Sequence, residues 1–295
     1  MHKSARVFGE MWRFHLRHDD AVRAGRAGAR PGGRTIVAAM AAAEEQAFEI
    51  VHAGGRRDLV VVCDHASNRV PAELAGLGLD AALLERHIGW DIGAGALARR
   101  LADLLDAPAV LAAFSRLVID PNRALDHPQS IPPESDGVPV PGNQGLDGAA
   151  RAHRAARYFD AYHGAIEARI SAALEVGVPA LLSIHSFTPV MNGSARPWHA
   201  AVLHDDELRL AAPVLDAFRR YPDLVVGDNV PYTGTSELTY TVPHHASRRG
   251  LPNVVIEVRQ DLIDTPQGVE RWAYLLGDVL AGPLADDRHR RIAAS

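Results

Sequence analysis

Short runs of apolar, often β-branched residues alternate with amphipathic segments from about residue 46 onward. This alternation is typical of an α/β protein in which helices cover a central sheet. We therefore predict a mixed, mostly parallel central sheet flanked by helices. The predicted strands are Leu59–Cys63, Ala109–Ala113, Leu117–Asp120, Ala180–His185, Ala200–Leu203, Leu224–Val226 and Asn253–Val258.

Two amphipathic segments predict long helices. The segment after Asp91 places its leucines near one face and its charged residues largely elsewhere. The second segment, from about Gly148 to Val176, stacks large apolar residues at i, i+4 spacing. We expect both apolar stripes to belong to the core. Residues 126–145, rich in Pro, Gly, Ser and Asn, predict a functional lid or rim.

The first part of the chain has a different composition. Residues 1–39 hold eight Lys or Arg against three Asp or Glu, with an Ala/Gly/Arg-rich stretch that has little to bury. We predict that residues 1–45 form a disordered leader and that residues 46–295 form a single domain. Since Met40 opens a more ordinary sequence, we also consider that translation starts there.

The composition favours small molecules as partners. The 295 residues carry a formal net charge of -5, which gives no electrostatic reason to bind nucleic acid or an anionic membrane. No apolar run is long enough for a membrane span, and the N-terminus lacks the apolar core of a secretory signal. The one cysteine, Cys63, closes an apolar run and predicts a buried thiol. We expect a cytoplasmic protein, and the oligomeric state stays open.

Polar residues concentrate where the predicted strands end. The first strand is followed by Asp64-His65-Ala66-Ser67-Asn68, another ends in Asp120-Pro121-Asn122-Arg123, a third in His185-Ser186 and the last in Glu257-Val258-Arg259. In open α/β sheets, ligands bind outside the carboxyl ends of the strands. The sequence therefore predicts one site at that edge of the sheet.

Two histidines and one acidic residue predict a metal centre at this edge. His65 and His185 are the imidazole ligands, and Asp91 in "HIGWDIGAG", at the start of a predicted helix, is the preferred carboxylate. Asn68 is the alternative ligand. Such a set suits one catalytic Zn²⁺, or another divalent metal, with a water in the remaining position. The alternative is that the histidines are ordinary loop residues and that Asp91 caps a helix.

Glu257 ends an otherwise apolar strand, where an unpaired carboxylate would be costly. A water on the metal would give this carboxylate a partner and a role as general base. The alternative is a structural ion pair with Arg259.

The segment "FSRLVIDPNR" suggests how a substrate is held. The fork of an arginine matches a carboxylate, so Arg116 and Arg123 near a metal site suggest a carboxylate-bearing substrate, with surface ion pairs as the alternative. Asn122 is a candidate to polarise a carbonyl or to hold the carboxylate.

Other polar motifs are less informative. His244 and His245 in "TVPHHASRRG" are candidates for a third ligand, for partners of a ligand or for a flexible loop, and we favour the loop. Tyr232 and Tyr240 are candidates to cover the site. Gly93 and Gly95 form a lone GxG that lacks the rest of a dinucleotide fingerprint, so we do not expect a nucleotide cofactor.

At this point the sequence resembles the N-formylglutamate amidohydrolase family, zinc hydrolases similar in fold to carboxypeptidases. The resemblance spans roughly residues 57–282 and depends on five segments in the expected order: "CDHASNRVP", "HIGWDIGAG", "SRLVIDPNR", "LLSIHSFTP" and "VVIEVRQDL". It implies a zinc-carboxypeptidase-like fold of the phosphorylase/hydrolase-like type.

The resemblance also implies roles for individual residues. His65 and His185 correspond to metal ligands, Asn122 with Arg123 to the pair that grips a terminal carboxylate, and Glu257 to the general base. Arg116 looks like the arginine that polarises the scissile carbonyl. The carboxypeptidase pattern His-x-x-Glu is here His65-Ala-Ser-Asn68, and this departure favours Asp91 as the second ligand.

The activity implied is zinc-dependent hydrolysis of an N-acyl amide on an amino acid, with N-formyl-L-glutamate giving formate and L-glutamate. We also expect Ser186 and Arg259 to contact the substrate. Two alternatives stay open: the same chemistry on another N-acyl amino acid or a cell-wall peptide, and a metal- or carboxylate-binding module without catalysis.

Overall fold

The computed structural model describes residues 46–205, 207–232, 234, 239–286 and 291–292. The predicted leader, residues 1–45, lies outside the described residues. None of the described helices is both long enough and apolar enough to cross a membrane.

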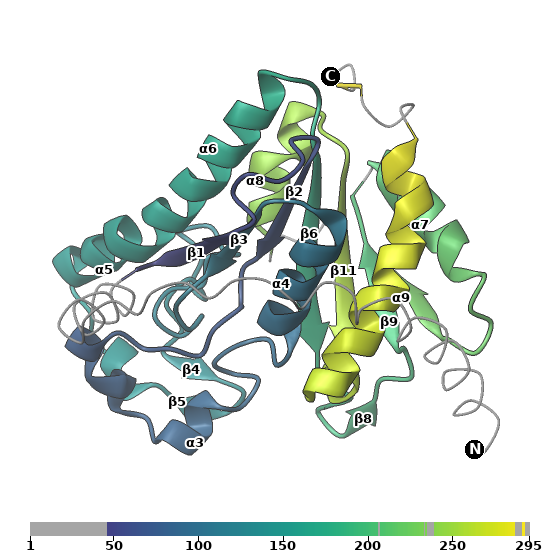
Figure 1. Cartoon of the computed structure of the whole chain (residues 1–295). Helices are drawn as coiled ribbons and strands as arrows, with labels where there is room; N and C mark the ends of the chain where they lie inside the picture. Colours follow the sequence, from purple (N-terminus) through teal and green to yellow (C-terminus); the bar gives the residue numbers. More distant parts are fainter. Residues whose placement is uncertain (1–45, 206, 233, 235–238, 287–290, 293–295) are drawn as a thin grey trace, which may run out of the picture. The chain divides into compact units, whose positions relative to one another are not determined.

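A seven-stranded sheet forms the centre of the protein, in the order β1-β3-β2-β6-β11-β9-β10 (Figure 1). Its strands are β1 (Phe48–Val51), β2 (Leu59–Cys63), β3 (Ala109–Ala112), β6 (Ala180–Phe187), β9 (Ala200–Leu203), β10 (Val226–Asp228) and β11 (Asn253–Arg259). Strands β3, β2, β6 and β11 are parallel neighbours, whereas β1 is antiparallel to β3 and β9 to β11. The prediction of a mixed, mostly parallel sheet is confirmed.

Helices cover both faces of the sheet. The main helices are α4 (Ala94–Leu105), α5 (Gly148–Arg154), α6 (Ala161–Leu174), α7 (Leu208–Phe218), α8 (Thr241–His245) and α9 (Pro266–Ala285). On one face α9 packs against both α4 and α7, while α6 and α8 pack together on the other (Figure 1). Alternate residues of β2 point to opposite faces of the sheet. Val60 and Val62 belong to the hydrophobic cluster that also contains Ile166 of α6.

Shorter elements complete the chain. They are the two-stranded pairs β4 (Glu134–Ser135) with β5 (Val138–Pro139) and β7 (Val190–Met191) with β8 (Ser194–Ala195), the helix α3 (Ala81–Leu84), and the helical turns η2 (Ala72–Gly78), η3 (Pro141–Asn143), η5 (Ser247–Arg249) and η6 (Gln260–Leu262). The long helix predicted over residues 148–176 is present as α5 and α6, joined by the π-helical turn η4 (Ala155–Asp160).

Two predicted strands need correction. Residues 117–120 form no strand, because the carbonyls of Leu117 and Val118 accept hydrogen bonds from the side chains of Asn143 and Arg154 instead of from a neighbouring strand. Strand β10 begins at Val226 rather than Leu224, where the pairing with Ala200 starts. Strand β1 was not predicted at all.

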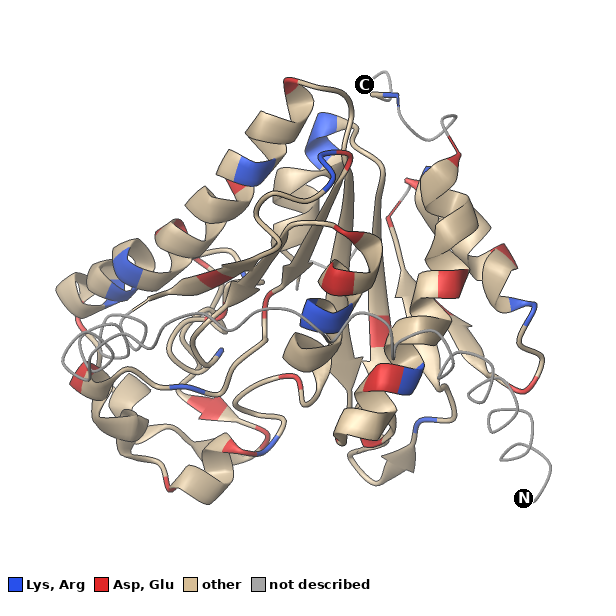
Figure 2. Cartoon of the chain, in the orientation of Figure 1, with Lys and Arg blue, Asp and Glu red and all other residues tan. Residues whose placement is uncertain are grey.

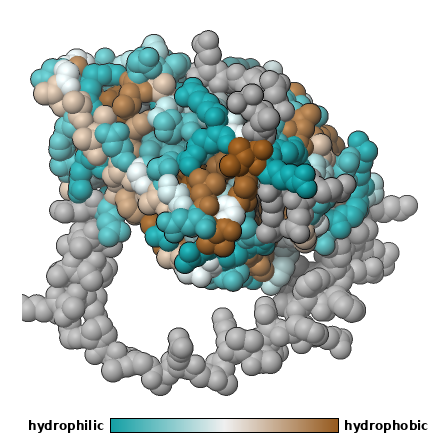
Figure 3. Space-filling model, turned by 90° about the horizontal axis from the view of Figure 1, so that it is seen from above, coloured by the Kyte–Doolittle hydropathy of each residue, from teal (hydrophilic) through white to brown (hydrophobic). Residues whose placement is uncertain are grey.

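In the part of the chain that the structure describes, the charges visible in Figure 2 do not mark a site. Acidic and basic residues are interspersed along the described elements rather than gathered by sign (Figure 2). On the face seen from above, apolar residues gather over a limited area with hydrophilic residues around them (Figure 3).

Cys63 is fully buried, as predicted. The functional site has to be located from the buried polar groups.

Candidate functional site

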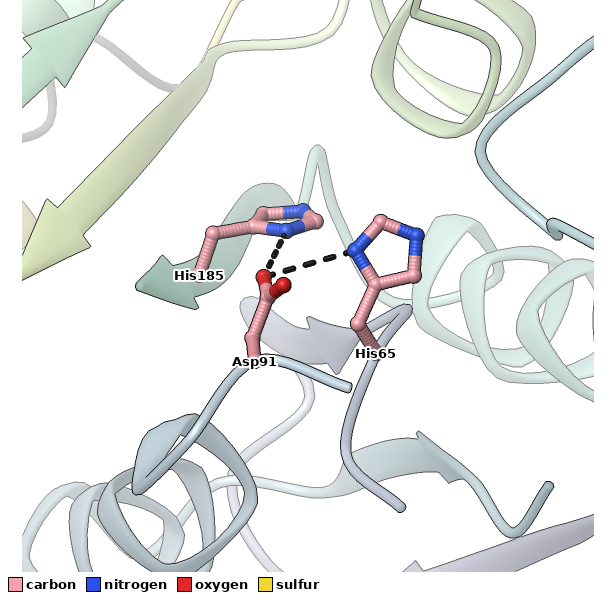
Figure 4. A group of neighbouring side chains, drawn as sticks. All are labelled: His65, Asp91 and His185. Atoms are coloured by element: carbon pink, nitrogen blue, oxygen red, sulfur yellow. Dashed lines mark hydrogen bonds and ion pairs between the residues drawn. The ribbon is translucent and has the colours of Figure 1, made fainter. Parts of the chain in front are cut away.

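His65, Asp91 and His185 converge at the carboxyl ends of β2 and β6. The Nδ1 atoms of His185 and His65 lie 2.9 and 3.3 Å from the same carboxylate oxygen, Oδ2 of Asp91 (Figure 4). One potential ligand atom from each residue lies within 4.8 Å of the others, and all three residues are buried. The prediction that these three side chains share one place is confirmed.

Backbone contacts fix Asp91 beside the loop of His65. The Asp91 N–H donates to the His65 carbonyl at 3.0 Å. Gly95 packs so closely that a Cβ there would lie 2.5 Å from the Ala66 carbonyl oxygen, and Gly93 has a φ of +79°. Gly95 therefore permits the close contact with Ala66, and Gly93 adopts a left-handed backbone conformation that favours glycine. Asp91 precedes α4, whose N-cap is Gly93, so it is not the cap of this helix.

Two further carboxylates hold the outer nitrogens of the histidines. Nε2 of His65 lies 2.8 Å from Oδ1 of Asp120, and Nε2 of His185 lies 3.2 Å from Oδ2 of Asp64. A carboxylate on the outer nitrogen orients an imidazole and directs its other nitrogen towards a metal. No role is predicted for Asp64 and Asp120 from the sequence, although both lie inside the motifs "CDHASNRVP" and "SRLVIDPNR".

The charges of this group stabilise one another. Burial would lower the pKa of His185, but hydrogen bonds to Asp64 and Asp91 raise it well above its ordinary value. Burial likewise opposes ionisation of Asp91, yet the charge of His65 and the hydrogen bond to His185 hold its pKa below the usual range. Asp91 is therefore ionised, as a metal ligand must be.

These residues fit a divalent cation. Two imidazole nitrogens and one carboxylate oxygen surround one point, which is a donor set that zinc accepts in catalytic sites. Both outer nitrogens are held by carboxylates, as is usual for histidines that bind metals. The three side chains that would hold the ion are His65, Asp91 and His185.

Glu257 lies next to this group on β11. It pairs in register with His185 of β6, is 7% exposed, and its Oε2 has no hydrogen-bond partner among the described residues. Burial raises the pKa of Glu257 to about 7. The alternative ion pair is not formed, because Arg259 pairs with Asp261 at 2.7 Å. Glu257 is thus a carboxylate able to exchange a proton near neutral pH.

Arg116 is bound within the acidic group. Its Nη2 lies 2.8 Å from Asp120 and its Nη1 lies 3.4 Å from Asp91. The guanidinium nevertheless lines the same cavity as Glu257. Arg116 therefore both balances the carboxylates and presents positive charge to the cavity.

The cavity has a volume of about 360 Å³ and contains most of the predicted site. Arg123, Asn122 and Ser186 line it, and Tyr232 does so as well. Oδ1 of Asn122 accepts hydrogen bonds from the N–H groups of Tyr240 and Thr241. The Ser186 hydroxyl donates to the Ile92 carbonyl at 2.8 Å.

Several predicted residues lie outside the lining of the cavity. Arg259 points its guanidinium at Asp261 and at the carbonyls of Arg196 and Trp198. Among the residues singled out from the sequence, the others outside the lining are Asn68, His244, His245, Tyr240 and the segment 126–145. The segment is instead fastened to residues 117–118 through Asn143 and Arg154, so the predicted lid does not border the cavity.

His245 belongs to a second histidine cluster. Its Nε2 lies 2.9 Å from Nδ1 of His163, whose Nε2 donates to the Pro121 carbonyl at 2.9 Å. Residues 241–245 form helix α8 rather than the favoured loop. This cluster supports the segment that carries Asn122 and Arg123 instead of supplying a third ligand.

The fold and the buried group define an α/β protein with a donor set that could hold a metal ion at the carboxyl edge of its sheet. Residues 57–264 match the family model of N-formylglutamate amidohydrolase. This match covers more than half of the chain, and the chain therefore belongs to the N-formylglutamate amidohydrolase family, whose members are hydrolases.

Solved structures give the same assignment of the fold. A gene product of Agrobacterium tumefaciens is 36% identical, over 83% of this chain and 97% of that one, with a TM-score of 0.79. An N-formylglutamate amidohydrolase from Ralstonia eutropha is 20% identical, over 82% of this chain and 98% of that one, with a TM-score of 0.59. None of the curated proteins matches the sequence.

Proposed function

We propose that this protein is a zinc-dependent hydrolase of N-acyl amides on amino acids, with N-formyl-L-glutamate, cleaved to formate and L-glutamate, as the first case to test. The observation that carries the proposal is the convergence of His65, Asp91 and His185 beside Glu257 in one cavity. Membership of an amidohydrolase family supports the reaction class.

A divalent cation held by the three ligands would lower the pKa of a bound water towards ~7 and polarise the scissile carbonyl. Glu257 has the burial and the raised pKa of a general base, and its Oε2 is available to accept a proton. It takes a proton from water, whose oxygen attacks the acyl carbon, and delivers that proton to the amide nitrogen as the C–N bond breaks. The products are a carboxylate and an amino acid.

The two arginines of the cavity have different tasks in this proposal. Arg116 stabilises the negative charge that develops on the acyl oxygen, a contribution typically worth about 10²–10³-fold in kcat for one donor. Arg123 binds the α-carboxylate of the substrate, for which its planar fork is suited, and Asn122 and Ser186 complete that wall. Arg259 has no part in the proposal, because its guanidinium is engaged by Asp261.

The test combines metal content with turnover. Purified protein should hold about one zinc per chain and release formate from N-formyl-L-glutamate, and a chelator should abolish both. Glu257→Gln should keep the metal and lose activity, since an amide cannot accept the proton. Bound metal without turnover on any N-formyl or N-acetyl amino acid would point to the binding module, and unchanged activity of Glu257→Gln would refute the mechanism.

A further inference from the structure

The cavity continues from His65, Asp91 and His185 along the face of the sheet. Strands β6, β11 and β9 lie side by side (Figure 1), and every second residue of a strand points to the same face. Glu257 is opposite His185, and two residues back Val255 is opposite both Ser183 of β6 and Leu203 of β9. Asn253 follows after two more residues. All of these residues line the cavity.

We name this part of the cavity the side-chain trough; its described lining residues are Ser183, Leu203, Val242, Asn253 and Val255. Successive rows of side chains along a strand are about 7 Å apart. The row of Val255 therefore begins about 7 Å from Glu257 and the row of Asn253 about 14 Å from it. A side chain of four or five bonds spans about 5–6 Å, so from an amino acid bound beside Glu257 it reaches the row of Val255, and its terminal group there faces the row of Asn253.

The trough is built from uncharged side chains. Neither arginine of the cavity belongs to the trough residues: Arg116 is bound to Asp120, and Asp120 to His65, while Arg123 interacts electrostatically with the same Asp120. Among the described lining residues near Leu203, His204 is held by Asp228 at 2.8 Å, and Asp205 adds a carboxylate. None of the described lining residues of the trough is a cation, so a carboxylate that enters it would lose its hydration without a charged partner among them, which is strongly unfavourable.

Two buried polar atoms of the trough have no hydrogen-bond partner among the described residues: Oγ of Ser183 and Oδ1 of Asn253. Both residues are at most 1% exposed. The Asn253 amide is oriented by its Nδ2, which donates to the Leu251 carbonyl at 3.0 Å, so its free oxygen needs a donor. A carboxylate cannot donate a hydrogen bond, whereas a carboxamide can.

We propose that the side-chain trough receives the side chain of the amino acid that is released, and that it selects an uncharged side chain ending in a hydrogen-bond donor, such as a carboxamide, over a carboxylate. This inference rests on the proposed amide hydrolysis and makes the substrate class more specific. It predicts that N-formyl-L-glutamine is a better substrate than N-formyl-L-glutamate.

The two compounds differ by one terminal group and are therefore a matched pair. We expect kcat/KM for formate release to be at least tenfold higher for N-formyl-L-glutamine. Equal values, or a preference for N-formyl-L-glutamate, would overturn the inference. The dissociation constants of both compounds, measured by calorimetry on the Glu257→Gln protein loaded with zinc, should show the same order.

Calorimetry also separates this inference from the proposed function. If the wild-type protein binds the glutamine compound more tightly but releases no formate from either compound, the hydrolase proposal fails while the selectivity of the trough stands. If formate is released with a preference for glutamate, the reaction stands and the trough inference fails.

A charge placed in the trough should invert the selectivity. Val255 is only partly buried and lines the cavity, so Val255→Lys adds a cation there. We expect the ratio of kcat/KM for glutamine over glutamate to fall at least tenfold, whereas the neutral control Val255→Met should keep the ratio within about twofold. An unchanged ratio in a folded Val255→Lys protein would show that substrate side chains bind elsewhere. The comparison of the two compounds on the unmodified protein needs no variant.

Discussion

Two buried histidine pairs in this protein have opposite electrostatic surroundings. His65 and His185 lie at a ring distance of 5.1 Å and contact three carboxylates, from Asp64, Asp91 and Asp120. His163 and His245 are also 5.1 Å apart.

The second pair contacts a carbonyl, each other and one exposed carboxylate, since Nδ1 of His245 lies 3.6 Å from Glu167. Burial nevertheless lowers the pKa of both His163 and His245 to about 4. The pKa values of the first pair are raised although all four histidines are buried. The comparison teaches that the partner, and not burial, decides which histidine pair is suited to a cation site and which is suited to packing.

The strongest test of this comparison removes one imidazole from each pair. His185→Gln should lose the bound metal and, since a metal contributes several kcal/mol of transition-state stabilisation, roughly a thousandfold in kcat/KM at 1.36 kcal/mol per tenfold. His163→Gln should keep its zinc, because this residue lies outside the ligand group. Metal analysis and formate release check both variants. Loss of zinc in His163→Gln would mean that the two pairs are not independent.

A smaller effect is expected from the carboxylates behind the ligands. Asp120→Asn and Asp64→Asn keep the shape but remove the charge that holds Nε2 of His65 and His185. We expect zinc affinity to fall by about 10–100-fold, measured by competition with a chromophoric chelator. Asp103→Asn, on the exposed side of α4, serves as the matched control and should leave the affinity unchanged. If all three variants bind zinc alike, these carboxylates do not tune the site.

The smallest effect concerns stability at mildly acidic pH. The folded pKa of His163 and His245, about 4, lies below the unfolded value near 6.5. The unfolded state therefore binds more protons between these values, and the free energy of unfolding decreases as the pH falls from 6.5 towards 4. The loss should be about 1 kcal/mol for each histidine between pH 7 and pH 5.5.

Denaturant unfolding at both pH values measures this loss. The double variant His163→Gln/His245→Gln is the reference, because it lacks both groups while the remaining titratable groups are kept. The decrease should be smaller in the variant than in the wild-type protein. Equal decreases would show that other groups cause the acid sensitivity.

The sequence predicts the parts of the site that depend on local pattern. Leu59–Cys63, Ala180–His185 and Asn253–Val258 read as buried strands, and they bring His65, His185 and Glu257 to one edge in the structure. Parallel strands align their carboxyl ends, so this convergence follows from the fold class alone.

Other features depend on contacts between distant residues. The partners of His65 and His185 are 55 and 121 residues away, at Asp120 and Asp64, and no spacing announces such pairs. Residues 117–120 have the composition of a strand, but tertiary hydrogen bonds from Asn143 and Arg154 take their carbonyls. Arg259 is predicted to contact the substrate for the same reason: the sequence pattern does not show that its guanidinium pairs with Asp261.

The hydrogen bond from the Asp91 N–H to the His65 carbonyl, with Gly95 packed on Ala66, joins the segments of two proposed ligands through their backbones. The conformational entropy lost in bringing these ligands together is then lost when the chain folds, and not when an ion binds. A centre assembled in this way is preorganised. We expect its affinity for a cation to reflect the donor atoms themselves, and the same backbone link means that a change in one loop would be transmitted to both proposed ligands.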